Sequence, residues 1–290
     1  MRFRSLGRLI LGLWLVGMQS SAGPLPAEGW LQSHDLKGLP GGGYSALHLS
    51  PDGLRGLVMT DKGGLMRLSL TRDAEGRITK VKAGRLEPIL DTNGKPLRPG
   101  QNDTEGLAVA ADGRLWISTE GTARVLAFDA LGAVPQRMRR PMVFARFPPN
   151  TAFEALALSP QGELWLIPEA PLTPGLLPVY VWSGTDWEER HTLKADPFWL
   201  VADAAFDDRG RLYLLERLFA GPAGFASRLR RFDIGATEGE VILRTPLGAH
   251  DNLEGLSLWR DTEGLRASMV SDDNFLKVFR AELVEYRLPD

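Results

Sequence analysis

The hydrophobic pattern of the chain repeats five times. Each repeat has a short segment of alternating apolar residues, a turn at a dipeptide that contains Gly, and a second apolar segment. This alternation predicts a half-buried β-strand, and Asp-Gly and similar dipeptides supply the positive φ of tight hairpins. The segments are YSALHLSPDGLRGLVMTD (44–61), TEGLAVAADGRLWISTE (104–120), FEALALSPQGELWLIPE (153–169), VADAAFDDRGRLYLLER (201–217) and LEGLSLWRDTEGLRASMVSDD (253–273).

The spacing of the repeats indicates the fold class. Their first strands start at Ser45, Glu105, Glu154, Asp203 and Glu254, at intervals of 60, 49, 49 and 51 residues. A period near 50 with room for four strands is typical of a β-propeller. The sequence therefore predicts an all-β propeller with five blades, or six if the 60-residue interval holds a degenerate unit.

The gaps between the paired segments have room for third and fourth strands. After Glu254 the chain is too short for a full blade, so Gly29–Lys37 is predicted to supply its outer strand and close the ring. The other strand pairs are expected at Leu65–Leu70 with Ile78–Leu90, Val125–Phe128 with Met142–Phe147, Val179–Trp182 with Glu188–Leu193, and Leu229–Phe232 with Glu240–Arg244.

The first 22 residues have the pattern of a secretory signal. Three arginines precede the apolar run Leu9–Met18, and Ser20-Ser21-Ala22 offers small residues for cleavage. The run is short for a membrane span, although an uncleaved anchor is the alternative interpretation. We expect residues 23–290 to form one propeller domain that is periplasmic or secreted, with no stable membrane anchor after cleavage.

Composition excludes several classes of function. Lys plus Arg is 34 and Asp plus Glu is 36, so no basic excess exists for nucleic-acid binding. The chain has no Cys, which excludes disulfides, iron–sulfur clusters, thiolate zinc sites and cysteine nucleophiles. With 4 His in the whole chain, a three-histidine metal centre is improbable.

Acidic residues recur at one end of the predicted hairpins. They open the first strands and end the second strands, and antiparallel pairing puts these two positions side by side. The innermost strands line the axis of a propeller, so we expect the acids to converge on one central mouth. The candidates are Glu105, Glu154, Asp203 and Glu254 at strand starts, and Asp61, Glu120, Glu169, Glu216 and Asp272-Asp273 at strand ends.

Such a cluster predicts a cation site, because adjacent carboxylates repel one another in a partly dry environment. Oxygen ligands without Cys or a His cluster favour Ca²⁺, and Mg²⁺ less. Asn102 and Asn252, just upstream of two of the glutamates, are candidate carbonyl ligands. The alternative is that several of these acids are solvated or bonded to backbone amides.

Several motifs resemble the phytase-like family of secreted bacterial propellers, described as having esterase-like activity of phytase. They are DTEGLAV, FEALALSPQGELW, VADAAFDDRGRLYLLERLF, and DNLEGLSLW followed by VSDDNF, and LxER and SDDNF are the most specific. The resemblance covers about residues 40–290. It implies an exported β-propeller with phosphoester or ester hydrolase activity.

Two residues are candidates for catalysis at the mouth. His250, four residues before Glu254, is a candidate general base, and Arg217 is a candidate for holding an anionic substrate group. No Gly-x-Ser-x-Gly elbow exists, and His48 is expected to be structural. Trp116, Trp165 and Tyr213, each three residues after a turn glycine, are expected in the core.

Two functions remain open from the sequence. One is a calcium-dependent hydrolase acting on a small-molecule ester, phosphoester or lactone. The other is a non-enzymatic propeller that is stabilised by calcium and binds a protein or a small ligand. A fold alone does not choose between them.

Overall fold

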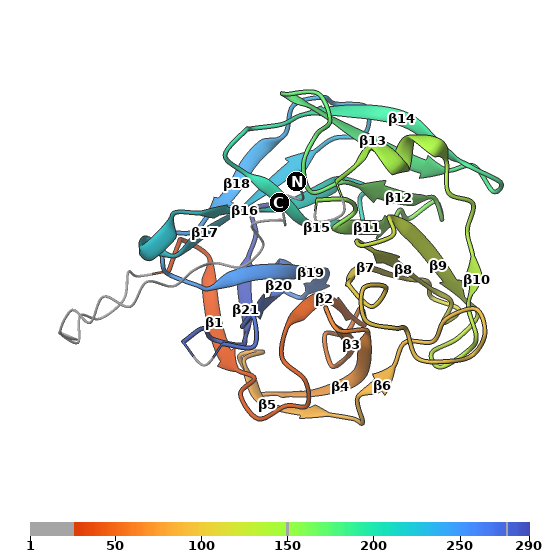
Figure 1. Cartoon of the computed structure of the whole chain (residues 1–290). Helices are drawn as coiled ribbons and strands as arrows, with labels where there is room; N and C mark the ends of the chain where they lie inside the picture. The colour runs from red at the N-terminus through yellow and green to blue at the C-terminus, as the bar shows by residue number, and fades with distance from the viewer. Residues whose placement is uncertain (1–25, 149–150, 277) are drawn as a thin grey trace.

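Five antiparallel sheets surround a central axis in the computed structural model of the chain (Figure 1). The structure describes residues 26–148, 151–276 and 278–290, so the predicted signal segment lies outside it. The innermost strand of each sheet contacts the innermost strands of both neighbours, which makes a closed ring. The predicted five-bladed β-propeller is therefore confirmed. Among the described residues, no helix is long and apolar enough to cross a membrane.

Each blade has its innermost strand at the axis and its last strand at the rim. Blades 1 and 2 contain β2 (Tyr44–Leu49), β3 (Arg55–Thr60), β4 (Gly64–Arg72), β5 (Ile78–Ala83) and β6 (Glu87–Pro88), and then β7 (Thr104–Val109), β8 (Leu115–Thr119), β9 (Arg124–Phe128) and β10 (Gln136–Arg137). Blades 3 and 4 contain β11 (Ala155–Leu158), β12 (Leu164–Ile167), β13 (Leu176–Trp182) and β14 (Trp187–Lys194), and then β15 (Leu200–Phe206), β16 (Leu212–Phe219), β17 (Phe225–Phe232) and β18 (Glu240–Arg244).

Blade 5 joins the two ends of the described chain. Its inner strands are β19 (Asn252–Asp261), β20 (Gly264–Asp272) and β21 (Glu282–Arg287), and its outer strand is β1 (Trp30–Asp35). β1 pairs antiparallel with β21, with Asp35 opposite Glu282. In Figure 1 the red-orange β1 lies directly beside the blue β21. The prediction that an N-terminal strand closes the ring is confirmed.

One predicted strand is wrong. Met142–Phe147 was expected to be the fourth strand of blade 2, but Met142–Arg146 forms a 3-10 helix. The outer strand of this blade is the short β10. Pro141 precedes the helix in an extended conformation, and the turn buries Phe144 with its ring 4.3 Å from that of Phe153. Burial of two aromatic rings, Phe144 and Phe147, and not alternation, accounts for the apolar residues of the segment.

The core lies between neighbouring blades. Trp165 and Tyr213 are buried there, and Trp116 is partly buried against the cluster between blades 2 and 3, as expected for core residues. Polar side chains also join the blades at the axis: Ser45 Oγ donates to the Thr104 carbonyl, and Ser257 Oγ accepts from the Leu49 amide. These bonds set the inner strands at fixed heights relative to one another.

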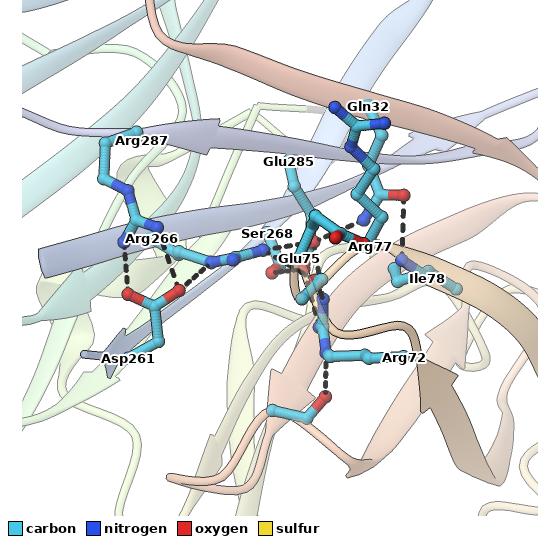
Figure 2. A network of polar contacts seen from close by, with 12 residues as sticks. Gln32, Arg72, Glu75, Arg77, Ile78, Asp261, Arg266, Ser268, Glu285 and Arg287 are labelled. Carbon is cyan, nitrogen blue, oxygen red and sulfur yellow. Dashed lines mark hydrogen bonds and ion pairs between the residues drawn. The ribbon is translucent and has the colours of Figure 1, made fainter. Parts of the chain in front are cut away.

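A buried ionic network joins blade 5 to blade 1 (Figure 2). Glu285 of β21 has a fully buried carboxylate that accepts hydrogen bonds of 2.7 and 2.8 Å from Arg72 of β4. Gln32 of β1 and Ser268 of β20 each donate a further bond of 2.7 Å. Burial opposes ionisation of Glu285, yet these donors outweigh it and hold its pKa below the ordinary value.

We expect Glu285→Ala to destabilise the protein by about 3–5 kcal/mol, because it leaves Arg72 as an uncompensated buried cation. Urea unfolding measures the effect. The control is Glu238→Ala, which removes an exposed pair with Lys194 and should change stability by less than about 1 kcal/mol. Equal effects of the two variants would contradict a special role for the closure network.

Candidate functional site

Backbone irregularities turn side chains toward the axis at the start of the inner strands. In blades 2 and 5 the strand pairing shifts register around Glu105 and at Glu254, so each glutamate lies in a β-bulge. Ser45 and Ala202 occupy the corresponding bulges of blades 1 and 4, and Glu154 directly precedes β11. A bulge re-aims a side chain that regular pleating would direct into the sheet. Three glutamates thereby meet at one mouth.

Two overlapping carboxylate groups form at this mouth. Asp103, Glu105 and Glu120 place one oxygen each within 4.8 Å of one another. Glu120, Glu154 and Glu169 do the same, so Glu120 belongs to both groups. The four glutamates are buried and Asp103 is half-buried. Carboxylate oxygens at this spacing suit a hard cation such as Ca²⁺.

Arg217 lies among the glutamates of blades 3 and 5. Its Nη2 is 2.8 Å from Glu169 and 3.8 Å from Glu154, and its Nη1 bonds to Glu254. Burial opposes the charge of Arg217, but the three carboxylates outweigh burial and raise its pKa above the ordinary value. Arg217 is therefore a cation supplied by the chain itself.

Two predicted ligands point elsewhere. Glu216 accepts bonds from Arg228 Nε at 2.6 Å and from Arg230 Nη2 at 2.6 Å, on the face of β16 opposite Arg217. Asp203 accepts from the amides of Ala204 and Leu256 at 2.8 and 2.7 Å, so it links the inner strands of blades 4 and 5. Both carboxylates are neutralised or bonded within the blades and do not join the two carboxylate groups.

The remaining acids extend the mouth toward blades 1 and 5. Asp61 bonds to Lys62 at 2.7 Å through Oδ2, and its Oδ1 is buried without a partner among the described residues. Asp272 accepts from the Asn274 amide at 2.6 Å. Asn252 donates to Glu254 at 2.6 Å and so holds a glutamate of the mouth. Asn102 donates to the Lys62 carbonyl instead.

Burial and mutual repulsion make the carboxyls of the mouth weak acids. For Glu105 and Glu154 burial is the larger cause, neighbouring glutamates add to it, and the pKa values are raised well above the ordinary range. The same causes raise the pKa of Glu120 to about 8 and that of Asp272 to about 8. These carboxyls therefore retain protons near neutral pH unless a cation binds beside them.

The histidines lie apart from the carboxylate groups. His250 Nε2 is 2.7 Å from the Tyr286 hydroxyl, and its Nδ1 is buried without a partner among the described residues. Burial, then the charge of Arg280, lowers the pKa of His250 to about 4. His48 lines a cavity of about 130 Å³ at the opposite end of the axis.

Asp103 is the site residue that sequence reasoning missed. It precedes Glu105 by two positions, as Asn252 precedes Glu254, and alternate residues of an extended chain share a face. Counting from the turn glycines also shows that Arg217, and not Glu216, has the mouth position in blade 4. Glu120, Glu169 and Arg217 each follow their turn glycine by seven residues, whereas Glu216 follows by six.

Comparison with known families agrees with this architecture. The sequence profile of the phytase-like family, described as "Esterase-like activity of phytase", matches residues 40–275. The chain belongs to the phytase-like family. The matched region includes Glu105, Glu154 and Glu254, the three mouth glutamates at strand starts. It ends at Phe275 of the SDDNF motif. No curated protein matches the chain.

This phytase-like chain is also similar in fold to solved propellers at low sequence identity. An aldose sugar dehydrogenase from Streptomyces coelicolor is 13% identical, with a TM-score of 0.49 over 91% of this chain and 99% of that one. A gluconolactonase from Xanthomonas campestris is 17% identical, with a TM-score of 0.40 over 81% and 69%. A virginiamycin B lyase from Staphylococcus aureus is 11% identical, with a TM-score of 0.43 over 89% and 74%. Similarities at this level carry no functional argument.

The raised pKa values predict that the metal-free protein loses stability as pH rises. Glu120 and Asp272 have ordinary pKa values of 4.5 and 3.8 and folded values of about 8, so the folded state binds more protons than the unfolded state between these limits. Each such carboxyl lowers stability by up to about 1.4 kcal/mol per pH unit across that window. Melting temperatures measured in chelator from about pH 5 to about pH 8 should fall, and less steeply in Glu120→Gln. A flat profile, or an equal effect of the exposed Glu240→Gln, would contradict this.

His250→Phe should act on stability and leave the mouth intact. The variant deprives the buried Tyr286 hydroxyl of its partner, which costs about 1–3 kcal/mol. Urea unfolding near pH 7.5 measures this loss. Because the pKa of His250 falls from 6.5 to about 4 on folding, wild-type His250 makes stability rise with pH between these values, and its removal should steepen the fall of melting temperature there. Above about pH 7 the fall should keep its wild-type slope, and a changed slope in that range would place His250 in electrostatic contact with the carboxylates.

Proposed function

We infer that the protein is a calcium-dependent hydrolase of a small-molecule ester or phosphoester, with its site at the mouth of the ring. The observation that carries this proposal is Glu105. Glu105 is 8% exposed, and its carboxylate lies with those of Asp103 and Glu120 within 4.8 Å while forming no ion pair with a described Lys or Arg. A buried carboxylate normally has a partner, and a divalent cation bonded to Asp103, Glu105 and Glu120 would provide it.

Arg217 supports the choice between the two carboxylate groups. Its guanidinium already compensates Glu169 and Glu254 and approaches Glu154. Lys62 and Arg217 oppose the rise in pKa of Asp103 and Glu120 from a distance, but neither forms an ion pair with the acids of blade 2 among the described residues. The proposed calcium site is therefore the group Asp103, Glu105 and Glu120, with Glu154 beside it.

The chemistry of such a site suits hydrolysis. A bound cation polarises a carbonyl or phosphoryl oxygen and lowers the pKa of a water molecule on it. Glu154 and Glu169 lie at the same mouth and are positioned to accept a proton from that water. Arg217 holds Glu169 and Glu254 in position and does not bind the substrate directly. His250 takes no part in the proposed reaction.

Family membership supports the class of reaction and the location. The phytase-like family is described by esterase-like activity. The predicted signal at residues 1–22 supports a periplasmic or secreted location. Calcium is abundant enough in such compartments to fill weak sites, which bind in the range of about 10⁻⁴–10⁻³ M.

The test is calcium titration by calorimetry on chelator-treated protein, followed by turnover of neutral carboxylic esters and phosphoesters with and without calcium. Wild type should bind calcium and show turnover that depends on it. Glu105→Gln should lose at least about tenfold in calcium affinity, because a neutral amide replaces a charged ligand. Glu240→Gln, an exposed change at the rim, is the matched control.

The outcomes separate the two candidate functions. Binding with turnover that Glu105→Gln removes supports the hydrolase. Binding that raises the melting temperature without turnover of any ester supports the alternative, a calcium-stabilised propeller that binds a ligand. Calcium affinity that is equal in wild type and Glu105→Gln would overturn the proposed site.

A further inference from the structure

A groove runs from the mouth across the junction of blades 1 and 5. It has a volume of about 470 Å³, and its apolar lining includes Leu39, Phe275, Leu276, Val278 and Phe279, with Asp273 at the end beside Gly43. Cavities of this size bind small molecules. Charged residues also line the groove, and Arg280 among them pairs with Asp251 and Glu282, so the apolar surface is a patch within the groove.

Close packing of backbone and side chains builds the end of the groove nearest the mouth. Gly43 has a φ of +63°, and a Cβ there would lie 2.5 Å from both Asp61 Oδ1 and the tip of the Phe275 ring. Asp273 Oδ1 accepts from the Gly43 amide at 2.9 Å and from the Phe275 amide at 3.1 Å. The Phe275 ring is thereby fixed beside Asp61, an acid of the mouth.

Phe275 itself has an unfavourable backbone conformation. Its φ is +54° and that of Asn274 is +48°, in the left-handed region that a bulky residue rarely occupies. The ring remains 49% exposed, with Lys62 Nζ 5.2 Å from its centroid. A strained backbone that exposes an aromatic ring beside a candidate site indicates that the ring is retained to bind a ligand.

Charge at the mouth restricts what the groove can hold. The acids of the mouth outnumber Arg217, Lys62 and one divalent cation, so a substrate with many negative charges is repelled. Within the groove, Phe275, Leu276 and Val278 are 49%, 46% and 73% exposed, and this apolar patch favours an uncharged apolar group. A neutral ester satisfies both surfaces, with its reacting carbonyl at the mouth and its acyl chain in the groove.

We propose that this groove is the subsite for the apolar acyl chain of a neutral carboxylic ester, and that Phe275 determines specificity for that chain. The reaction at this subsite rests on the proposed hydrolase function, but binding in the groove can be measured without it. Phe275 is a specificity residue in this account and takes no part in the bond cleavage.

Uncleavable probes test the groove directly. Linear primary amides from butanamide to octanamide are titrated by calorimetry into the calcium-loaded protein. In wild type we expect the affinity to rise about two- to fourfold for each added methylene. Phe275→Asn removes the ring and tolerates the left-handed backbone, so it should flatten this dependence. Phe198→Asn, which removes a 76% exposed ring that does not line the groove, is the matched control and should behave as wild type.

Each outcome has one meaning. No dependence of affinity on chain length, or equal slopes in Phe275→Asn and Phe198→Asn, overturns the subsite. Self-association of the protein that Phe275→Asn abolishes, seen by sedimentation, also overturns it and assigns the groove to a contact between copies. Turnover of p-nitrophenyl esters with the same acyl chains is measured separately. Length-dependent binding without any turnover keeps the subsite and removes the hydrolase.

Discussion

The pairing of β1 with β21 is the constraint on which the rest of the structure depends. The carboxylates of the mouth come from blades 1, 2, 3 and 5, and their mutual repulsion pushes the blades apart. A ring resists that repulsion only when it is closed. Besides the contacts between the inner strands β19 and β2, closure rests on one strand ladder and on the buried Glu285–Arg72 pair at the outer side of blade 5.

Polar contacts at the axis convert closure into a defined site. Ser45, Ser257 and Asp203 each bond to the backbone of a neighbouring inner strand. These bonds fix the relative heights of the strands, and the bulges then set the direction of Glu105 and Glu254. Arg217 removes part of the repulsion without a metal ion. The mouth is thus a compromise between ring geometry and charge, in which Lys62 and Arg217 only partly offset the acids of blade 2.

Much of the fold follows from the sequence because the strong signals are local. Hairpins with alternating apolar residues and a turn glycine repeat at a nearly constant spacing, and this spacing predicted five blades and the closing strand. The segment Met142–Phe147 was misassigned because a buried aromatic on a short helix and an outer strand have similar apolar content. The flanking Pro141 was the evidence against a strand, since the six-residue length of the segment suits a strand equally well.

The site was predictable as a region and less so residue by residue. Side chains alternate along a strand, so an error of one position moves a residue to the other face. Glu216 was placed at the mouth on this account, while its neighbour Arg217 lies there. Asp103 was missed for the same reason, since Asn102 was chosen one residue away. Bulges add an extra residue to one strand and are invisible in the alternation itself.

Because strands from both ends of the described chain close the ring, closure must follow the synthesis of the last strand. Trp30 pairs with Tyr286, so the first strand of the described chain must wait for the last one. Blades 1 to 4 are complete in sequence order, but a chain that ends before Glu282 has no partner for β1. A contact of such long range is slow to form. Until β21 has been made, β1 has no pairing partner. The new chain can complete its fold only when its final hairpin is present.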